Sequence, residues 1–379
     1  MRPYVLQGHT RPLNHVVYNT EGDLLVTCGK DSNINLWWTD NGVRAGSFDG
    51  HNGVVWTVDM TYDSQRLLSA AGDSSARLWN MTTGEEQFRW RFNEPARACK
   101  FSVGERMAAI STDPFMNNVS AIRVFNIAED LSEQSDEELL NLTGPRGRIT
   151  RLHWVDCNRS LLSSSEDGVV RRWDVETGKC VAEAALHGKQ VMDMQMSADG
   201  THFITASSDR TSKLVDTQSF EVMKEYKSAA PINSAALSPI FNHVLIGGGQ
   251  DAAAVTTTAA RAGYFEARFF HKVFAEEIAN VRGHFSPINS VAFSPDGTSF
   301  VTGAEEGNVR LHHFDADYFT TAWDNLIGPN VGPAGTSVLS EGPYAGTTRG
   351  TISGSGTGSG AHPLGGRKTG TSGSGSGPT

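Results

Sequence analysis

The sequence predicts an all-β fold built from seven similar units. A pair of short β patterns recurs seven times along the chain, and within each pattern apolar and polar residues alternate between turn residues. Period-two alternation of this kind is typical of antiparallel strands. A spacing of ~42 residues matches the four-stranded blade of a WD-type propeller. We therefore expect a seven-bladed WD-repeat β-propeller closed by the N-terminal strand, followed by a disordered C-terminal tail.

The two strand patterns are easiest to see side by side. The first begins with a small or polar residue, as in LNHVVYN from Leu13, VMDMQMS from Val191 and INSVAFS from Ile288. The second follows a turn such as EGD or SPDG and ends in a cluster of Ser, Thr or Gly, as in RLLSAAGD and SFVTGAEE. Each unit therefore begins with two adjacent strands.

A fixed set of polar residues and tryptophan accompanies the strands. Asp31 and Asp73 each stand six residues before a tryptophan, and a Thr or Ser stands four residues before each aspartate. A Gly-His pair opens the same units. Across the blades the set comprises His9, Thr27, Asp31, Trp37, His51, Ser69, Asp73, Trp79, Ser163, Asp167, Trp173, His187, Thr205, Asp209, His284 and Thr302.

Some units lack a member of this set. Pro145 stands where the fourth unit would have its histidine, and Val215 takes the tryptophan position of the fifth. The last unit has Glu306 for the aspartate and His312 for the tryptophan.

We interpret the recurring set as a structural hydrogen-bond network within each blade. The loop histidine can reach the Ser or Thr, the turn aspartate and the indole, which satisfies polar groups that packing would otherwise bury alone. The same residue types also make a catalytic Ser-His-Asp set. A nucleophile site occurs once in a protein, whereas this set recurs blade by blade, so the structural interpretation is favoured.

Two units depart from the repeat by insertion. In the third, Phe125 takes the tryptophan position and the preceding turn is lengthened. In the sixth, Gly247 replaces the Ser or Thr, Thr257 stands at the tryptophan position, and about a dozen extra residues precede Gly283. We expect both insertions to form loops or extended hairpins.

The chain ends suggest how the ring closes. A strand-like segment, PYVLQ, precedes the first Gly-His without a blade of its own, and the last unit has no good fourth strand. The N-terminal strand should therefore complete the last blade and hide its edge. These patterns divide the chain into a propeller, residues 1–324, and a Gly/Ser-rich tail, residues 325–379, too poor in apolar residues to fold. The acidic segment 129–140 reads as a solvated surface loop.

Composition limits the functions that need to be considered. The formal net charge is −10, so general electrostatic capture of nucleic acid is not expected. The four cysteines lie far apart, which argues against a zinc site or a disulfide framework and suits a reducing compartment. No apolar run reaches the ~18 residues that a membrane span needs. We expect a cytoplasmic protein that binds neither membranes nor RNA directly.

No motif in the sequence assembles an active site. The stretch GGGQD at 247–251 is rich in glycine but lacks the Lys-Ser/Thr of a phosphate-binding loop. RAGYFEARFFHKVF at 261–274 mixes basic and aromatic residues and is the one stretch that suggests RNA contact. We favour the alternative, that its phenylalanines pack onto the propeller. No catalytic residue, metal ligand or cofactor is assigned.

Several stretches resemble one particular WD-repeat family, the I subunit of eukaryotic translation initiation factor 3. The opening LQGHTRPLNHVVYNTEGDLLVTCGKD and the fifth unit, FITASSDRTSKLVD, carry the resemblance. The most specific segments are GGGQDAAAVTTT, the insertion GYFEARFFHKVF and RGHFSPINSVAFSPDG, because WD proteins in general lack this insertion. The resemblance covers about residues 1–323.

The resemblance implies a scaffold subunit, a monomer within a hetero-oligomer. It would dock the B and G subunits of initiation factor 3 and contact the small ribosomal subunit through that complex. In the family the partner surface lies on the sides of blades five and six, which here carry Asp209, Arg210, Asp216, Tyr226 and Lys227 at positions expected to be exposed. The segment KSAAP at 227–231 departs from the family pattern, and Asp209 is also a member of the blade network.

Three other functions compete with the scaffold. A signalling adaptor of the kinase-receptor type would share the propeller but not the insertion in the sixth unit. An enzyme would need a convergent set of catalytic groups, and none can be assigned. Direct RNA binding is disfavoured by the negative charge.

Overall fold

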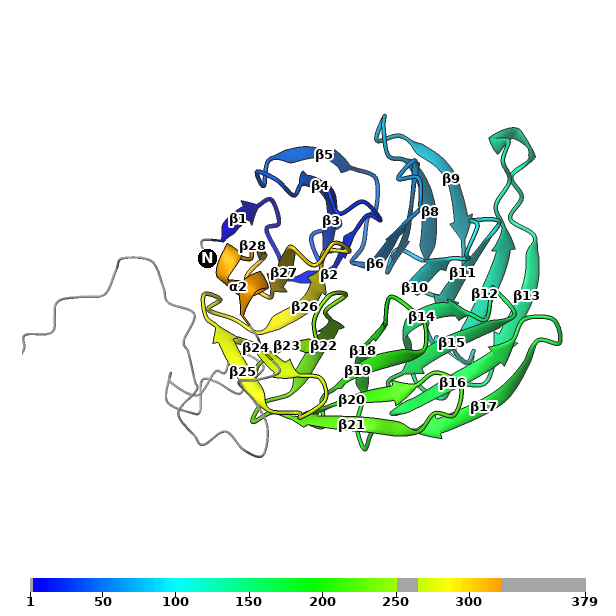
Figure 1. Cartoon of the computed structure of the whole chain (residues 1–379). Helices are drawn as coiled ribbons and strands as arrows, with labels where there is room; N and C mark the ends of the chain where they lie inside the picture. The colour runs from blue at the N-terminus through cyan, green and yellow to red at the C-terminus, as the bar shows by residue number, and fades with distance from the viewer. Residues whose placement is uncertain (1–2, 117, 251–264, 322, 324–379) are drawn as a thin grey trace, which may run out of the picture. The chain divides into compact units, whose positions relative to one another are not determined.

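The computed structural model describes residues 3–116, 118–250, 265–321 and 323. Seven four-stranded antiparallel sheets are arranged in a ring around a central axis (Figure 1). This confirms the predicted seven-bladed β-propeller. The predicted tail, residues 325–379, lies outside the described residues.

Each blade runs from an inner strand at the axis to an outer strand at the rim. The strands of blades one to three are β2 (Leu13–Tyr18), β3 (Leu24–Gly29), β4 (Ile34–Trp38), β5 (Arg44–Phe48); β6 (Val55–Met60), β7 (Arg66–Ala71), β8 (Ser75–Asn80), β9 (Glu86–Arg91); β10 (Ala96–Phe101), β11 (Met107–Thr112), β12 (Ala121–Asn126), β13 (Glu138–Thr143).

Blades four to seven follow in the same order. Their strands are β14 (Ile149–Val155), β15 (Ser160–Ser165), β16 (Val169–Asp174), β17 (Lys179–Ala185); β18 (Val191–Met196), β19 (His202–Ser207), β20 (Thr211–Asp216), β21 (Val222–Lys227); β22 (Ile232–Leu237), β23 (His243–Gly248), β24 (Ala267–His271), β25 (Glu277–Val281); β26 (Ile288–Phe293), β27 (Ser299–Ala304), β28 (Asn308–His313) and β1 (Tyr4–Gln7).

The N-terminal strand completes the last blade, as the sequence predicts. β1 pairs antiparallel with β28, with Tyr4 opposite Leu311 and Gln7 opposite Asn308. Leu6 of β1 is buried between blades seven and one, in a cluster with Leu13, Trp37 and Leu311. The two ends of the propeller domain are therefore joined within one sheet.

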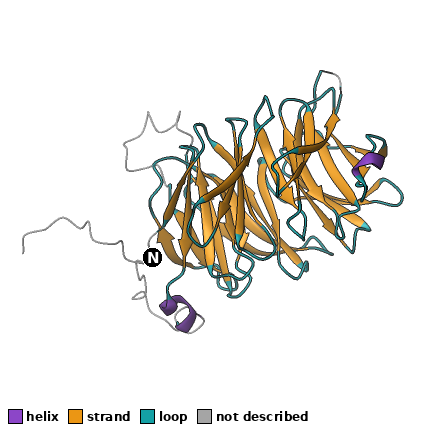
Figure 2. Ribbon diagram, turned by 90° about the horizontal axis from the view of Figure 1, so that it is seen from above, coloured by secondary structure: helices purple, strands orange, loops and turns teal. Residues whose placement is uncertain are grey.

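The core lies between neighbouring blades. Each cluster of buried side chains joins the facing surfaces of two sheets; Trp79, for example, packs with Phe48 and Val26 of the preceding blade. Close packing of this kind explains the glycines at 247 and 303, where a Cβ atom would lie 2.7 Å from Ile288 and 1.9 Å from Leu13. A view along the rim shows the strands crossing the thickness of the ring, with loops at both ends (Figure 2).

The third strand of blade six corrects one sequence assignment. Thr257 was expected at the tryptophan position, but residues 267–271 form the third strand, and Phe270 pairs with Val244 as Trp37 pairs with Leu25. Thr257 itself lies outside the described residues. Counting at a fixed interval fails here because the extra residues precede the third strand rather than follow it.

The acidic segment 129–140 is not simply a loop. It contains the 3-10 turn η1 (Leu131–Glu133) and the first residues of β13, the outer strand of blade three. Gln134 Nε2 donates to the carbonyl oxygen of Asn126 at 2.8 Å, which ties the segment back to the blade.

A short helix that the sequence analysis missed follows the last blade. In α2 (Ala316–Thr320), Tyr318 is buried against Phe314 with ring centroids 3.8 Å apart. Its hydroxyl lies 2.7 Å from Nδ1 of His243, so the helix covers the ends of blades six and seven. The aromatic run FDADYF marks this helix in the sequence.

Candidate functional site

In the blades that keep the histidine, the residues of the predicted blade network are joined by hydrogen bonds. In blade one, Asp31 accepts from Nδ1 of His9 at 3.0 Å, and Nε2 of His9 lies 2.9 Å from the hydroxyl of Thr27. That hydroxyl also accepts from Nε1 of Trp37 at 2.9 Å. Four side chains from two loops and two strands thus form one chain of hydrogen bonds.

The same chain recurs in other blades with substitutions. His51, Ser69, Asp73 and Trp79 repeat it in blade two at 2.7–2.9 Å. Two blades lack the tryptophan: blade five has His187, Thr205 and Asp209, and blade seven has His284, Thr302 and Glu306. Blade four lacks the histidine and keeps the bond between Ser163 and Trp173. In blade four, where the histidine is absent, Arg171 pairs with Asp167 at 2.9 Å, and the equivalent pair in blade two, Arg77 and Asp73, lies at 3.4 Å beside His51.

The electrostatics of these groups follow from burial and pairing. Burial lowers the pKa of His51, against the raising effect of the Asp73 carboxylate. Although burial opposes its charged form, Asp73 has a lowered pKa because it accepts hydrogen bonds from His51 and Ser75. Asp209 behaves alike, and hydrogen bonds from Thr211 and His187 bring its pKa to about 2. Near neutral pH the His51–Asp73 and His187–Asp209 pairs are each a neutral imidazole that donates to a carboxylate.

The hydroxyl groups of the networks are closed to solvent. Thr27, Ser69 and Thr205 are fully buried, and each hydroxyl is enclosed by its histidine and, where present, its tryptophan. A hydroxyl in this position cannot attack a substrate that arrives from solution.

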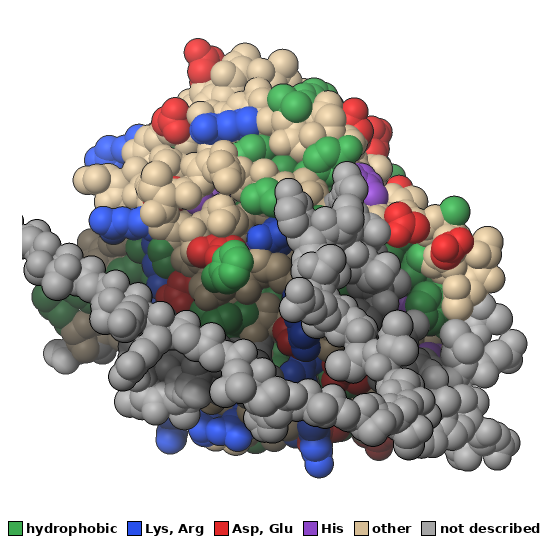
Figure 3. Space-filling model, turned by 90° about the vertical axis from the view of Figure 1, so that its left-hand side faces the viewer, with side chains coloured by type: hydrophobic (Ala, Val, Ile, Leu, Met, Phe, Trp, Pro, Cys, Tyr) green, Lys and Arg blue, Asp and Glu red, His purple; other side chains and the backbone are tan. Residues whose placement is uncertain are grey.

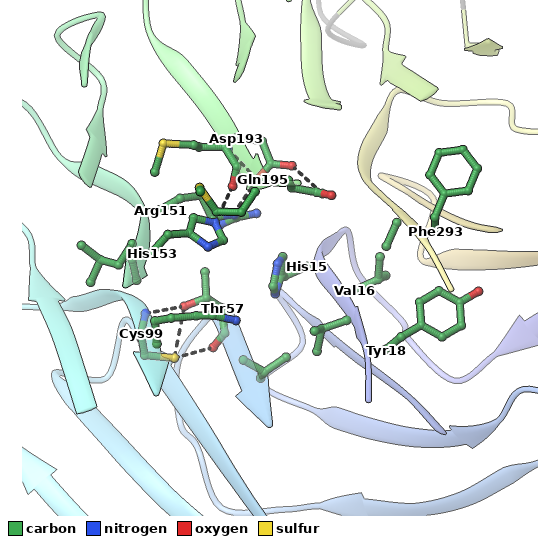
Figure 4. A pocket seen from close by; sticks show the side chains of 18 of the residues that line it. His15, Val16, Tyr18, Thr57, Cys99, Arg151, His153, Asp193, Gln195 and Phe293 are labelled. Atoms are coloured by element: carbon green, nitrogen blue, oxygen red, sulfur yellow. Dashed lines mark hydrogen bonds and ion pairs between the residues drawn. The ribbon is translucent and has the colours of Figure 1, made fainter. Parts of the chain in front are cut away.

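The inner strands enclose an axial cavity of about 340 Å³. Figure 4 shows His15 and His153 on its wall, together with Arg151 and Asp193. Arg151 Nε donates to Asp193 at 2.6 Å, and Lys100 pairs with Asp59 at 2.5 Å, so both cations have a carboxylate partner.

Burial also shifts the pKa of two further groups on the cavity wall. It lowers the pKa of His153 to about 4 and raises the pKa of the Cys99 thiol to about 12. The imidazole is therefore neutral and the thiol protonated near neutral pH. The cavity wall joins the inner strands by polar contacts; for example, His153 Nε2 donates to the carbonyl oxygen of Met194 at 2.8 Å.

The five predicted partner-binding residues do not form one site. Arg210 and Lys227 are exposed at one end of blade five, where Ser228 N donates to the carbonyl oxygen of Arg210 at 2.9 Å. Asp209 stands beside them but is occupied by the blade network. Asp216 lies at the other end of β20, about 17 Å away at 3.3 Å per residue, where it accepts from Ser219 in its own turn.

Tyr226 corrects the expectation of an exposed contact residue. It is fully buried, its ring lies 5.9 Å from that of Phe270, and its hydroxyl donates to the carbonyl oxygen of Lys272 at 2.7 Å. The register of the outer strands explains this. Phe48, Trp90 and Leu142 occupy the equivalent positions of other blades, and each is buried against a neighbouring sheet. The signal was present in the sequence, since a large apolar residue recurs two positions before the loop that opens the next blade.

Arg66 at the start of β7 makes a contact between two blades. Its guanidinium donates to the carbonyl oxygens of Ala128 and Glu129 at 2.9 and 3.0 Å. Arg66 therefore ties blade two to the connection in blade three, a contact that no spacing in the sequence reveals.

The fold and the blade networks together define the WD-repeat class of β-propellers. Among the residues that the structure describes, no helix is long and apolar enough to cross a membrane.

Comparison with known proteins identifies the family. The EIF3I family model matches residues 1–324. Three proteins with the name eukaryotic translation initiation factor 3 subunit I are similar over most of their length. The protein of Bombyx mori is 46% identical over 327 residues, 86% of this chain and 99% of that protein. The protein of Xenopus tropicalis is 42% identical over 319 residues, 84% and 98% respectively, and that of Drosophila melanogaster is 42% identical over 328 residues, 86% and 100%.

The chain belongs to the family of subunit I of eukaryotic translation initiation factor 3. This confirms the resemblance seen in the sequence and assigns the protein to translation initiation. It also separates the chain from signalling adaptors that share only the propeller.

Proposed function

We propose that this chain is a non-enzymatic, cytoplasmic scaffold subunit of the initiation factor 3 complex. It docks the B and G subunits while the initiation complex assembles on the small ribosomal subunit. Family membership supports the complex, and the family resemblance suggests the two partners. The docking module is residues 1–324, and the blade networks within it are structural.

The outer strand of blade five carries this proposal. Val222, Met223, Lys224 and Glu225 are consecutive and all exposed, with 44% of Val222 and 52% of Met223 accessible to solvent. The outer strands of the other blades begin with one to three exposed residues. An exposed strand edge with apolar side chains suits an extended or helical segment from a partner.

Charged residues at the end of the same strand would orient the partner. Lys227 is the last residue of β21, and Arg210 stands in the adjoining turn. Of the five residues first considered, we propose that these two contact the partner directly. The carboxylate of Asp209 is already occupied by His187 and Thr211, and Tyr226 is buried.

The negative charge of the chain supports contact with the ribosome through other subunits. At a net charge of −10 the surface repels the phosphates of ribosomal RNA. We propose a monomer that enters the complex by protein–protein contacts.

The test is the binding of the C-terminal region of the B subunit to the purified chain. Arg210→Glu combined with Lys227→Glu should weaken binding at least 10-fold and leave the melting temperature unchanged, because both side chains are exposed. Arg91→Glu is the matched control. Arg91 is the last residue of β9 and lies opposite Ser75 in the sheet of blade two. Lys227 is likewise the last residue of β21 and lies opposite Thr211 in blade five.

The outcomes separate docking at blade five from other arrangements. Calorimetric titration should give one B segment per chain, with the Arg91→Glu variant equal to the unaltered chain. Equal affinity for the double variant, or loss of binding in the Arg91→Glu variant alone, would show that docking occurs elsewhere.

A further inference from the structure

Two turns at one end of blade six carry apolar residues where the other blades carry polar ones. The turn between the third and fourth strands has the same form in five blades, with a hydrogen bond of 2.9–3.1 Å from the fifth residue to the first, as from Ala275 N to His271 O. Its two tip residues are exposed and polar in four blades, where they are Asp40-Asn41, Thr82-Thr83, Glu176-Thr177 and Gln218-Ser219. In blade six they are Val273 and Phe274, which are 47% and 41% exposed.

The turn between the first and second strands of blade six differs in the same way. In blades two and seven this turn has an aspartate, and Ser294 Oγ, for instance, donates to Asp296 at 2.6 Å. Blade six has Ser-Pro-Ile in place of Ser-Pro-Asp, and Ile240 is 51% exposed. The repeat therefore folds with a polar residue at each of these three positions, so the apolar ones are not required by the turn.

These residues lie close together. Lys272 N donates to the carbonyl oxygen of Asn242 at 2.7 Å, which joins the two turns. Beside them, the ring of Phe241 lies 6.3 Å from that of Phe319 on α2, and Phe319 is 39% exposed. The two turns and the helix thus bring exposed apolar side chains together at this end of blade six. We call this group the blade-six patch, and it comprises Ile240, Phe241, Val273, Phe274 and Phe319.

One cation borders the patch. In the described part of the chain the ammonium group of Lys272 makes no ion pair. Burial lowers the pKa of Lys272, and the nearby carboxylate of Asp199 in blade five opposes this shift but is too distant to pair with the ammonium group. The same helix that supplies Phe319 also carries an exposed carboxylate, Asp317. A carboxylate near the patch disfavours an anionic lipid surface, whereas a protein segment can supply a carboxylate for Lys272.

We propose that the blade-six patch is a second docking surface, which takes a protein segment with two or more large apolar side chains and a neighbouring carboxylate. The apolar side chains would cover Val273, Phe274 and Phe319, and the carboxylate would pair with Lys272. Contiguous apolar surface is characteristic of interaction sites, whereas single exposed apolar residues are not. This surface is separate from Arg210 and Lys227, which lie at the opposite end of the strands of the neighbouring blade, and its test does not depend on the docking of the B subunit.

Site-specific photocrosslinking in cells that make the full chain tests the proposal. A photoreactive phenylalanine analogue at Phe274 should crosslink to one protein, at a segment that mass spectrometry shows to contain large apolar residues and an acidic residue. The same analogue at Tyr62 is the matched control, because Tyr62 is an exposed aromatic residue in a turn at the same end of blade two.

A variant that copies the turns of other blades should abolish the crosslink without unfolding the chain. Ile240→Asp restores the Ser-Pro-Asp turn of blade seven, and Val273→Thr with Phe274→Thr restores the Thr-Thr turn of blade two. In this triple variant the analogue is placed at Phe319, and the yield should fall at least 10-fold relative to the same position in the unaltered background. Lys272→Gln should lower the yield several-fold.

Other results would overturn the proposal. A crosslink from Phe274 to lipid alone, to a second copy of this chain or to residues 325–379 of the same chain would be such a result. A crosslinked product that is the same from Tyr62 as from Phe274 would be another. Undiminished yield in the triple variant, with its melting temperature retained, would also exclude the patch. If the charge reversals at Arg210 and Lys227 do not weaken binding of the B subunit, the crosslinking result at Phe274 still stands. The two docking surfaces are therefore tested independently.

Discussion

At the scale of single residues, the blade network gives hydrogen-bond partners to polar groups that packing buries. The turn that joins the second and third strands leaves backbone donors and an aspartate near the packed sheets. Asp73 accepts from Nδ1 of His51, from the hydroxyl of Ser75 and from the backbone N–H of Asn52. One carboxylate thus links the loop that opens the blade, which contains His51 and Asn52, to the start of the third strand, where Ser75 lies. In blade four, which lacks the histidine, Asp167 keeps its ion pair with Arg171.

Replacement of this aspartate should be costly. Asp73→Ala leaves buried donors without an acceptor, and we expect the free energy of unfolding to fall by roughly 1–3 kcal/mol. Urea denaturation gives the value. Asp130→Ala is the control, because the exposed carboxylate of Asp130 accepts only from Ser132, and its midpoint should stay close to that of the unaltered chain. Equal midpoints for the two variants would remove the structural interpretation of the aspartates.

At the scale of elements, the outermost strand of the last blade has unusual importance for its size. β1 has only four residues, but it covers the edge of β28 and brings Leu6 into the interface between blades seven and one. An uncovered edge offers unpaired N–H and C=O groups to other chains. The short strand therefore protects the sheet as well as closing the ring.

Deletion of Met1–Gln7 should disable folding far more than its length suggests. It opens the edge of β28 and removes Leu6, whose loss alone would cost about 2–5 kcal/mol by analogy with other buried leucines. We expect aggregated or insoluble protein on expression. Size-exclusion chromatography with light scattering is the measurement, and a soluble monomer with an unchanged melting temperature would contradict the closure.

At the scale of the whole molecule, buried neutral histidines make stability depend on pH. Burial lowers the pKa of the network histidines His51, His187 and His284. It lowers the pKa of the more deeply enclosed His153 to about 4 and that of His312 to about 3. His312, which takes a tryptophan position, stacks on Phe300 with ring centroids 4.5 Å apart. At pH values around and below 6.5 the unfolded chain therefore binds more protons at these residues than the folded chain does.

The free energy of unfolding should therefore fall as pH decreases from 6.5 and continue to fall towards pH 3. His153 alone should account for about 1 kcal/mol between pH 7.5 and 5.5. His153→Gln keeps a donor for the carbonyl oxygen of Met194 and removes the titration, so its urea midpoint should change less over this interval. Identical pH dependence of the two chains would show that His153 is not neutral in the folded state.

The number of blades, the closure by the N-terminal strand and most partners in the blade networks could be predicted from the sequence. These features depend on local periodicity and on fixed intervals, which follow from the pleat of a strand and the length of its turns. The register of His9, Thr27, Asp31 and Trp37 could be read in this way because all four belong to one repeat.

The contacts between blades and the place where the repeat is interrupted could not be predicted in this way. Tyr226 faces Phe270 of the next blade, Arg66 reaches the connection of blade three, and β24 begins after an insertion that no interval accounts for. The blade-six patch likewise arises from turns and a helix that are distant in sequence. Contacts of this kind depend on the packing of neighbouring sheets, and a pattern along one strand does not specify which surface its neighbour presents.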